Sequence, residues 1–388
     1  MIDFRLNQTE EFLSEILCHP DSLDRDKLSS LFSVLGEKYC FDTCEKNNVT
    51  CIAYYSLNQC QEIYLPEYWK DKFIENEKRI SEYMGELDNV STLLIKHDIR
   101  LVALKNSGIA RSLFPVYGAS PMGDIDVLVK KSDFRKAHKL LINNNYKMKF
   151  RSPLEEENIE SAELAGGSEY SIHLDSGSHL WFELQWRPIS GRWIREDQEP
   201  SSEDLISRSI PIERSDTRLL SPEDNLLQVA LHTAKHTYVR APGFRLHTDV
   251  DRIIRSSDID WIKFKDEVEA LEVKTAVYLS LLFAQRLLKT PVPEDVINDL
   301  APNKLKIKIM LLWLRKVGLF DPDGKKWGRI GYVIFVSLLY DNFQGLCKSA
   351  FPSQTIVRSQ YPHLKNAPLI WLYIIRLSDL LIKRILVK

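Results

Sequence analysis

The sequence has no long hydrophobic run and no excess of either charge, and each absence excludes a class of protein. No stretch reaches the roughly 18 to 20 uncharged apolar residues that a membrane-spanning helix needs, so we expect no transmembrane span. The net charge of the 388 residues is -2, and no basic stripe is interleaved with aromatic residues. Nucleic acid is therefore not an expected partner. The opening MIDFRLNQTEEF is polar from its third residue, which predicts no export signal and a cytoplasmic protein.

The six cysteines include none of the C-x2-C pairs that are typical of zinc sites. Four of them lie between Cys40 and Cys60, at the spacings C-x3-C, C-x6-C and C-x8-C. Thiols of a protein that is not exported are expected to stay reduced. These spacings favour small core residues over a zinc site.

Hydrophobic periodicity divides the chain into three expected regions, residues 1–95, 96–215 and 216–388. The first and last regions are predicted to be helical. Residues 66–99 predict one long amphipathic helix, with Asp88 and Asn89 as a candidate break. The last region opens with SPEDNLLQVALHTAKHTYV, where a serine cap, a proline and acids mark a helix start.

The middle region changes to alternating apolar and polar residues, which indicates strands. IRLVALK and MGDIDVLV are two expected strands, with a short helix between them. KSDFRKAHKLLINNNY predicts an amphipathic helix, and EYSIHLDSGSHLWFELQWRP predicts a hairpin around the turn DSGS. This order predicts an α+β protein, in which a small mixed sheet with helices is flanked by N-terminal and C-terminal helical regions.

The tail, residues 367–388, is basic and amphipathic, with Arg376, Asp379, Lys383 and Arg384 at helical spacing among apolar residues. A helix of this kind can lie on an anionic membrane surface. We favour the alternative, a C-terminal helix that packs on its own domain.

Two aspartates, Asp124 and Asp126, stand in the apolar strand MGDIDVLV. Side chains two residues apart in a strand share a face, so the two carboxylates lie roughly 7 Å apart at the backbone. Like charges at this distance repel unless a cation lies between them. Magnesium prefers such oxygen ligands, together with substrate phosphates. The alternative is that Asp124 only precedes the strand and that Asp126 faces solvent on an edge.

A third acid, Glu183, stands in the aromatic stretch HLWFELQW and shares a strand face with Trp181 and Gln185. A carboxylate in such a strand is costly unless it is paired. If this strand neighbours the aspartate strand, Glu183 completes a cluster of three carboxylates. The alternative is an exposed edge strand of alternating polarity.

Three stretches together resemble a known family: LVALKNSGIARSLFPVYGASPMGDIDVLVKKSDFRKAHKLLINNNYK, then FELQW, then HTAKH with RLHTDVDRI. A helix start with serine, a strand with D-x-D and a later strand with a third carboxylate resemble the uncharacterised nucleotidyltransferase family of bacterial biosynthetic clusters. That family is a branch of the DNA polymerase beta-like nucleotidyltransferase superfamily. The resemblance extends over residues 95–255 of the chain.

The resemblance implies an Mg²⁺-dependent transfer that uses two metal ions. Asp124 and Asp126 would hold both ions, and Glu183 would help to hold the catalytic one and assist deprotonation of an acceptor hydroxyl. The attacking oxygen would displace pyrophosphate from a nucleoside triphosphate, with ATP as the expected donor and AMP as the group transferred. The acceptor class stays open between a small molecule, a sugar, a peptide and a protein, in a bacterial biosynthetic or modification pathway.

Nucleotide contacts are expected from Lys105, Asn106, Ser107 and Gly123. Asn106 replaces a glycine of the family, and asparagine adopts the left-handed conformation more readily than most residues. Gly123 is expected to form a tight turn before the strand. The arginine that the family often has before D-x-D is replaced by GASPMG. Because both differences concern triphosphate binding, the alternative is a catalytically inactive nucleotidyltransferase fold that serves as a binding or assembly module.

A helix with His232 and His236 four residues apart follows the core, with Lys235 beside them. Hydrogen bonding between domains is the favoured role of these residues, ahead of substrate contact and of a metal site. A metal site would need a third ligand, for which Asp249 or Asp251 is a candidate. Arg187 in QWRP is a further candidate for phosphate contact, with a surface arginine as the alternative.

Overall fold

One mixed sheet of seven strands carries Asp126 and Glu183, and Asp124 directly precedes one of its strands. The computed structural model describes residues 5–386, except residues 115, 152–156, 175, 190–193, 239–242, 321–328, 362–363 and 365. The strands of the sheet follow the order β3-β4-β5-β2-β1-β7-β6. They are β1 (Val102–Leu104), β2 (Ile125–Leu128), β3 (Lys147–Met148), β4 (Gly167–His173), β5 (His179–Gln185), β6 (Ile210–Pro211) and β7 (Arg218–Leu219).

The aspartate strand β2 lies in the middle of this sheet. It runs antiparallel to β1 and parallel to β5. The predicted hairpin is confirmed, because β4 and β5 pair antiparallel along their whole length. The short pair β6 and β7 was not expected from the sequence, and it extends the sheet beyond β1. A central position protects β2 from solvent on both edges.

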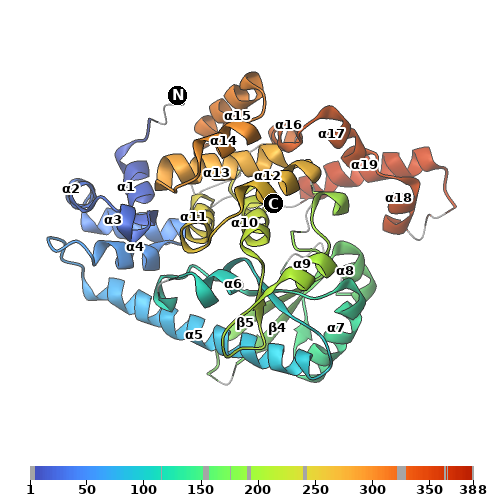
Figure 1. Ribbon diagram of the computed structural model, residues 1–388, viewed down its shortest axis with the longest axis horizontal. Coiled ribbons are helices and arrows are strands. Elements are labelled where there is room, and N and C mark those ends of the chain that lie inside the picture. Colours follow the sequence, from blue (N-terminus) through green and yellow to red (C-terminus); the bar gives the residue numbers. More distant parts are fainter. Residues whose placement is uncertain are drawn as a thin grey trace.

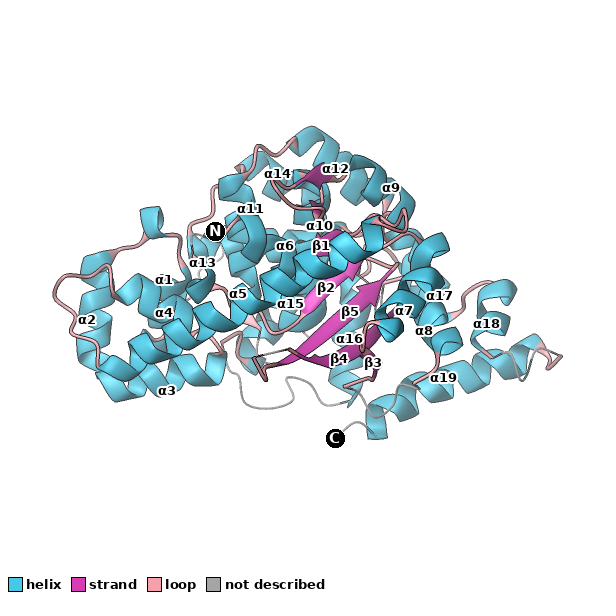
Figure 2. Ribbon diagram, turned by 90° about the horizontal axis from the view of Figure 1, so that it is seen from below, coloured by secondary structure: helices cyan, strands magenta, loops and turns pink. Residues whose placement is uncertain are grey.

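Helices α5 (Glu67–Ile95) and α7 (Phe134–Asn143) cover one face of the sheet. Figure 2 shows α5 running across the strands. Apolar side chains of alternate positions in β2 and β5 pack against these helices, among them Ile125, Val127 and Phe182. Full burial of such a side chain stabilises the fold by about 1.5–3 kcal/mol. The opposite face of the same strands is therefore the one that carries Asp126 and Glu183.

A helical layer lies over this opposite face, formed by α10 (Pro222–Thr237), α11 (His247–Ser256) and α13 (Lys274–Leu288). In Figure 1 these helices lie above the sheet, with the N-terminal helices on the left and the C-terminal helices on the right. Helix α10 begins as the sequence predicts, with Ser221 accepting a hydrogen bond from the backbone of Asp224. One hydrophobic core joins α10, α11 and α13 to residues of the N-terminal region, beginning with Phe12.

Three further helices belong to the middle region: α6 (Lys105–Ser112), α8 (Ile159–Ala165) and α9 (Ser202–Arg208). The remaining helices complete the two flanking regions. They are α1 (Gln8–Leu17), α2 (Arg25–Leu35), α3 (Glu37–Asn47), α4 (Thr50–Leu57), α12 (Trp261–Ala270), α14 (Glu294–Leu300), α15 (Lys304–Val317), α16 (Arg329–Leu339), α17 (Phe343–Ala350), α18 (Gln354–Gln360) and α19 (Leu369–Leu386). The predicted α+β class is confirmed. None of the helices in the described part of the chain combines the length and hydropathy that crossing a bilayer requires.

The break expected in the long N-terminal helix is wrong. Helix α5 is 29 residues long and continues through Asp88 and Asn89 without interruption. Asp88 binds the guanidinium of Arg111 at 2.8 Å, which ties α5 to α6. Asp88 therefore serves a contact between helices, whereas Asn89 donates a hydrogen bond to Glu86 within α5, and neither residue ends the helix.

Four of the six cysteines are buried, and Cys51 and Cys347 are half-buried. All six are free thiols, and Cys40, Cys44 and Cys60 belong to the helical core. Burial raises the pKa of the Cys44 thiol well above its usual value, so this thiol stays protonated.

The C-terminal helix α19 packs on its neighbours and also exposes apolar side chains. Tyr361 donates a hydrogen bond to Asp379 at 2.8 Å, and Tyr373 donates one to the carbonyl of Pro352 at 2.7 Å. Trp371 is 58% exposed on the outer side. Membrane-surface contact through residues 367–388 stays a prediction.

Candidate active site

Asp126 and Glu183 lie side by side on neighbouring parallel strands. The register pairs Asp126 of β2 with Glu183 of β5, and Leu104 of β1 with Asp126. Directly paired residues share a face of the sheet, so both carboxylates lie on the face opposite Ile125 and Val127. The Asp126 side chain is 4% exposed and the Glu183 side chain 18%. Strand pairing thus places the two acids next to each other in the interior.

The ammonium of Lys105 lies between these two carboxylates. Its Nζ is 2.6 Å from Asp126 Oδ1 and 3.5 Å from Glu183 Oε2. Lys105 begins α6 directly after β1, and its φ of 50° lies in the left-handed region. That conformation costs a residue other than glycine of order 1–3 kcal/mol. The backbone strain therefore coincides with the contact between the lysine and the carboxylates.

Burial and the neighbouring charges set the protonation of these three groups. Burial raises the pKa of the Asp126 carboxyl well above its usual value, against the opposing effect of Lys105, and the charge of Glu183 adds to the rise. Burial acts on Glu183 in the same sense, but Lys105, a hydrogen bond from Asp126 and Arg151 outweigh it and lower the pKa of Glu183 to about 2. Asp126 is therefore the carboxyl that takes up a proton first. Burial lowers the pKa of Lys105, yet both carboxylates outweigh it, so the ammonium stays charged.

Arg151 brings the third predicted carboxylate into the same group. Its guanidinium lies 2.6 Å from Asp124 Oδ2 and 2.9 Å from Glu169 Oε2, and it also contacts Glu183 Oε1. Glu169 is the residue of β4 that pairs with Glu183. One guanidinium thus separates Asp124 from Glu183, and one ammonium separates Asp126 from Glu183. The structure brings the three sequence-predicted carboxylates together around two cations.

Polar side chains fix the positions of the carboxylates. Gln185 donates from Nε2 to Asp126 Oδ1 and to Glu183 Oε2, both at 2.8 Å. The Ser107 hydroxyl accepts a hydrogen bond from the backbone N–H of Asp126 at 2.8 Å. Ser107 therefore holds α6 against β2, in addition to any contact with a nucleotide.

The donor set fits a hard divalent cation in its chemistry. Carboxylate oxygens such as those of Asp124, Asp126 and Glu183 are the ligands that magnesium prefers. Within the described residues, no group of three or more His, Cys, Asp or Glu side chains lies ready to hold a metal ion. Lys105 and Arg151 contact the oxygens that would be ligands, so metal binding requires both cations to move aside.

The backbone of the nucleotide-binding positions differs from the sequence analysis at two places. The left-handed conformation that Asn106 could adopt occurs one residue earlier, at Lys105. Gly123 has no positive φ, and a Cβ added there would meet nothing within 4 Å, so this glycine is not needed for a tight turn. Asn106 is buried, and its Oδ1 has no hydrogen-bond partner among the described residues.

A guanidinium stands beside the segment GASPMG, which precedes β2. Arg245, in the short helix that precedes α11, donates from a terminal nitrogen to the carbonyl of Pro121 at 2.9 Å. Burial lowers the pKa of Arg245, while the charges of Asp249 and Asp124 oppose that effect. The positive charge of Arg245 therefore interacts with Asp124, although the two residues lie far apart in the sequence.

Asp249 lies in the first turn of α11, directly after the short helix that carries Arg245. Its side chain is buried, and its Oδ1 has no hydrogen-bond partner among the described residues. Burial raises the pKa of Asp249 to about 7, against the opposing effects of Arg245 and Arg252. A buried carboxyl with an unsatisfied oxygen and a pKa near neutrality is a candidate for contact with a substrate.

The two histidines of α10 lie close to each other, with ring centroids 4.5 Å apart. Burial lowers the pKa of His232 well below its usual value, and His236, Lys105 and Lys235 add to the effect, so His232 is neutral. The influence of Lys105 indicates that α10 lies over the carboxylates. His232 Nδ1 has no partner among the described residues. Lys235 donates to the carbonyl of Ile189 at 3.2 Å.

Asp251 and Arg187 form ion pairs away from the three carboxylates. Asp251 binds Arg252 at 2.5 Å and Arg255 at 2.9 Å, so it is not a partner of the histidine pair. Arg187 contacts Glu199 and donates to the carbonyl of Ile194 at 3.2 Å. The side chain of Arg187 is thus used in the interior, and it touches none of the predicted metal ligands.

Sequence reasoning missed Arg151 and Arg245. Arg151 follows the very short strand β3, which has no alternating pattern, and Arg245 lies in a short 3₁₀ helix. One signal could have indicated them: four acids, including Glu169, meet on one sheet face, and buried carboxylates require cations. The need for cations near these acids could be inferred from the sequence. Only the three-dimensional arrangement shows that Arg151 and Arg245 are the cations.

Comparisons with known proteins agree with this geometry. The model of a family described as uncharacterised nucleotidyltransferase matches residues 38–289, which is more than half of the chain. No curated protein and no solved structure matches the chain. The matched range includes the sheet, the carboxylates, and helices α10 and α11. The chain belongs to this uncharacterised nucleotidyltransferase family.

Proposed function

We propose that the protein transfers AMP from ATP to an acceptor hydroxyl and releases pyrophosphate, with Mg²⁺ as cofactor. One observation carries the proposal: strand register places Asp126 beside Glu183 in the interior, with Asp124 one guanidinium away. In a nucleotidyltransferase, this arrangement supplies oxygen ligands where a triphosphate reacts. The expected setting is cytoplasmic.

Asp124, Asp126 and Glu183 would hold the metal ions. Bound Mg²⁺ would stabilise the negative charge on the entering and leaving oxygens. Lys105 and Arg151 would then be released from their present contacts, and both are long enough to turn toward the phosphates. Arg245 would supply the positive charge that the family places before its D-x-D motif.

The acceptor is expected to bind between the carboxylates and α10–α11. Three buried polar atoms on that side lack partners among the described residues, namely Asn106 Oδ1, His232 Nδ1 and Asp249 Oδ1. In the transfer, the acceptor oxygen bonds to the α-phosphorus, the bond to the pyrophosphate oxygen breaks, and the hydroxyl proton passes to a carboxylate. Asp249, with a pKa of about 7, is a stronger base than Glu183, with a pKa of about 2.

The test is transfer of labelled nucleotide. The protein is incubated with Mg²⁺, each α-labelled nucleoside triphosphate and panels of hydroxyl acceptors, and pyrophosphate release is followed. We expect transfer with ATP, and a loss of at least about 100-fold in Asp126→Asn, because this carboxylate would hold the metal ions that stabilise the entering and leaving oxygens. Asp133→Asn is the control, because this side chain makes no capping hydrogen bond to α7. Equal rates in the two variants would refute the assignment.

A second candidate is a nucleotidyltransferase fold that binds nucleotide without transferring it. Lys105 and Arg151 favour it, because both already neutralise the carboxylates. The two candidates differ in a binding experiment with a non-hydrolysable triphosphate. Stabilisation that requires Mg²⁺ and disappears in Asp126→Asn argues for the enzyme, and stabilisation without Mg²⁺ argues for the binding module.

A further inference from the structure

A second cavity lies apart from the candidate active site. It is bounded by α13, α14, α15 and the start of the N-terminal region, and its volume is about 830 Å³. None of its lining residues is among the candidate site residues. In Figure 1, α13, α14 and α15 lie above α10 and α11, while the sheet lies below them. Its volume is in the range of small-molecule pockets, roughly 300–1,000 Å³.

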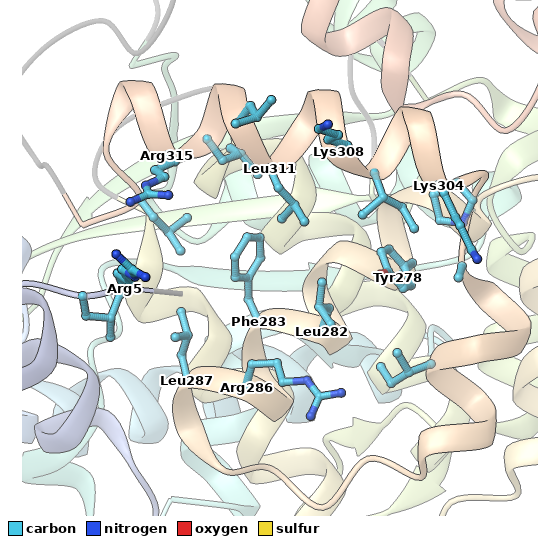
Figure 3. A pocket seen from close by; sticks show the side chains of 18 of the residues that line it. Arg5, Tyr278, Leu282, Phe283, Arg286, Leu287, Lys304, Lys308, Leu311 and Arg315 are labelled. Carbon is cyan, nitrogen blue, oxygen red and sulfur yellow. The ribbon is translucent and has the colours of Figure 1, made fainter. Parts of the chain in front are cut away.

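The floor and walls of this cavity are apolar. Helix α13 contributes Leu282, Phe283 and Leu287, and α15 contributes Ile307 and Leu311 from the opposite side. Figure 3 shows Phe283 and Leu311 facing each other at the centre of the cavity. The floor is rigid, because Phe283 and Leu287 are almost fully buried in the core. A preformed apolar slot of this kind suits an aliphatic chain.

The margin of the cavity is basic. Its charged lining residues are five cations and two acids, namely Arg5, Arg286, Lys304, Lys308, Arg315, Glu10 and Glu294. Figure 3 shows the labelled cations distributed around the apolar centre. One of the acids, Glu294, is already engaged, since it binds Arg286 at 3.0 Å.

Helix α15 carries most of this positive charge. The segment 302–320 contains no acidic residue, so no charge on its own element balances Lys304, Lys308 and Arg315. In the described part of the chain, these three side chains form no ion pair with a carboxylate. The cavity mouth therefore offers uncompensated positive charge next to apolar surface.

We propose that this cavity binds a single aliphatic chain that carries an anionic head group, a carboxylate or a phosphate. A small polar anion would leave the apolar floor uncovered, and an uncharged hydrocarbon would leave the basic margin without a partner. A cationic amphiphile would meet repulsion from α15. The proposal is independent of nucleotidyl transfer, because it involves no nucleotide and none of the carboxylates of the active site.

The direct test is calorimetric titration of the full chain with monomeric dodecanoate, dodecyl phosphate and dodecyltrimethylammonium, each below its micelle concentration. We expect saturable binding of one equivalent of either anion, at least about tenfold tighter than that of the cation, as expected for charge-assisted recognition. Equal affinity for the cation, or no saturable binding of either anion, would overturn the proposal.

Matched variants of α15 locate the site. Leu311→Trp fills the cavity, whereas Leu305→Trp makes the same change at a side chain that is 68% exposed and does not line it. Lys308→Glu reverses a charge at the margin, and Lys316→Glu reverses one on the same helix outside the lining. We expect about tenfold or greater weakening in the first variant of each pair and unchanged affinity in the second. Equal affinities within both pairs would exclude this cavity as the site.

A vesicle experiment distinguishes a free amphiphile from a membrane lipid as the source of the chain. Vesicles of neutral phospholipid with and without anionic phospholipid are sedimented with the wild-type protein and with Leu311→Trp. Binding to anionic vesicles that Leu311→Trp abolishes supports the site with a lipid as its source. Binding to vesicles that is indifferent to Leu311→Trp contradicts the proposed role of the cavity.

Discussion

A buried lysine dominates the electrostatics of the active site at the scale of single residues. Lys105 neutralises two carboxylates that strand register brings together, and its ammonium occupies the space between them. Removing one member of a buried ion pair leaves the other charge without compensation, which destabilises a protein more than the intact pair stabilises it. The same carboxylates would bind Mg²⁺, so lysine and metal compete for the same oxygens.

This competition predicts the behaviour of Lys105→Met. We expect the variant to lose about 3–5 kcal/mol of unfolding free energy without metal, because Asp126 and Glu183 then lie together without an ammonium. Mg²⁺ should restore part of this loss and raise the melting temperature more than in the wild type. Thermal and urea unfolding with and without Mg²⁺ measure both effects. Lys139→Met, on the exposed side of α7, is the control, and no stabilisation of Lys105→Met by Mg²⁺ would argue against a metal at these carboxylates.

Asp249 gives stability a distinct pH dependence. Its pKa rises from 3.8 in its ordinary state to about 7 in the fold, so between these values the folded protein binds a proton that the unfolded chain does not. The contribution of Asp249 to stability therefore falls as pH rises from about 4 to 7, and it is constant above.

Asp249→Asn removes this dependence. The change from 3.8 to about 7 corresponds to roughly 4 kcal/mol. At pH 8 the unfolding free energy of the variant should therefore exceed that of the wild type by up to roughly 4 kcal/mol. Near pH 4 the two unfolding free energies should be similar. Urea unfolding across this pH range measures the difference, with exposed Asp258→Asn as the control. A difference that does not vary with pH would mean that Asp249 ionises normally in the fold.

At the scale of elements, the parts that follow local patterns were predictable and those set by strand order were not. Alternation in β2, β4 and β5 predicted the strands, the hairpin and the face on which Asp126 and Glu183 lie. The adjacency of β2 and β5 could only be assumed, because parallel pairing connects segments far apart in the sequence. Arg151 and Arg245 were missed for a related reason. Each lies far from the acids in the sequence, and neither belongs to an element with a periodic pattern.

Gly243 directly precedes the short helix that carries Arg245 and leads into α11, where Asp249 lies. A Cβ added to Gly243 would lie 2.4 Å from Thr237 Cα and 2.8 Å from its carbonyl oxygen. We therefore expect Gly243→Ala to destabilise the protein by about 1–3 kcal/mol, because backbone atoms must shift. Gly85→Ala is the matched control: nothing lies within 4 Å of the added Cβ, and alanine in the middle of α5 should stabilise by about 0.5–1 kcal/mol. Opposite signs in thermal unfolding would support the close approach at Gly243, and equal effects would contradict it.

At the scale of the whole molecule, the N-terminal helices and the C-terminal helical layer share one core. Phe12 and Ile16 of α1 belong to the same cluster as residues of α10, α11 and α13. Ser14 donates to the carbonyl of Leu287 at 2.5 Å, and Glu15 binds Lys289 at 2.7 Å. The boundaries expected at residues 95 and 215 stay predictions, and this shared core suggests that the flanking regions unfold together.

Phe12→Ala tests that cooperation. Phe12 is fully buried, so its truncation should cost about 3–5 kcal/mol. If the flanking regions form one cooperative unit, amide hydrogen exchange should speed up in α10, α11 and α13 as well as in α1 to α4. If they are independent domains, faster exchange should stay within residues 1–95. Tyr64→Ala, at a side chain that is 87% exposed, is the control and should leave the exchange of both regions unchanged.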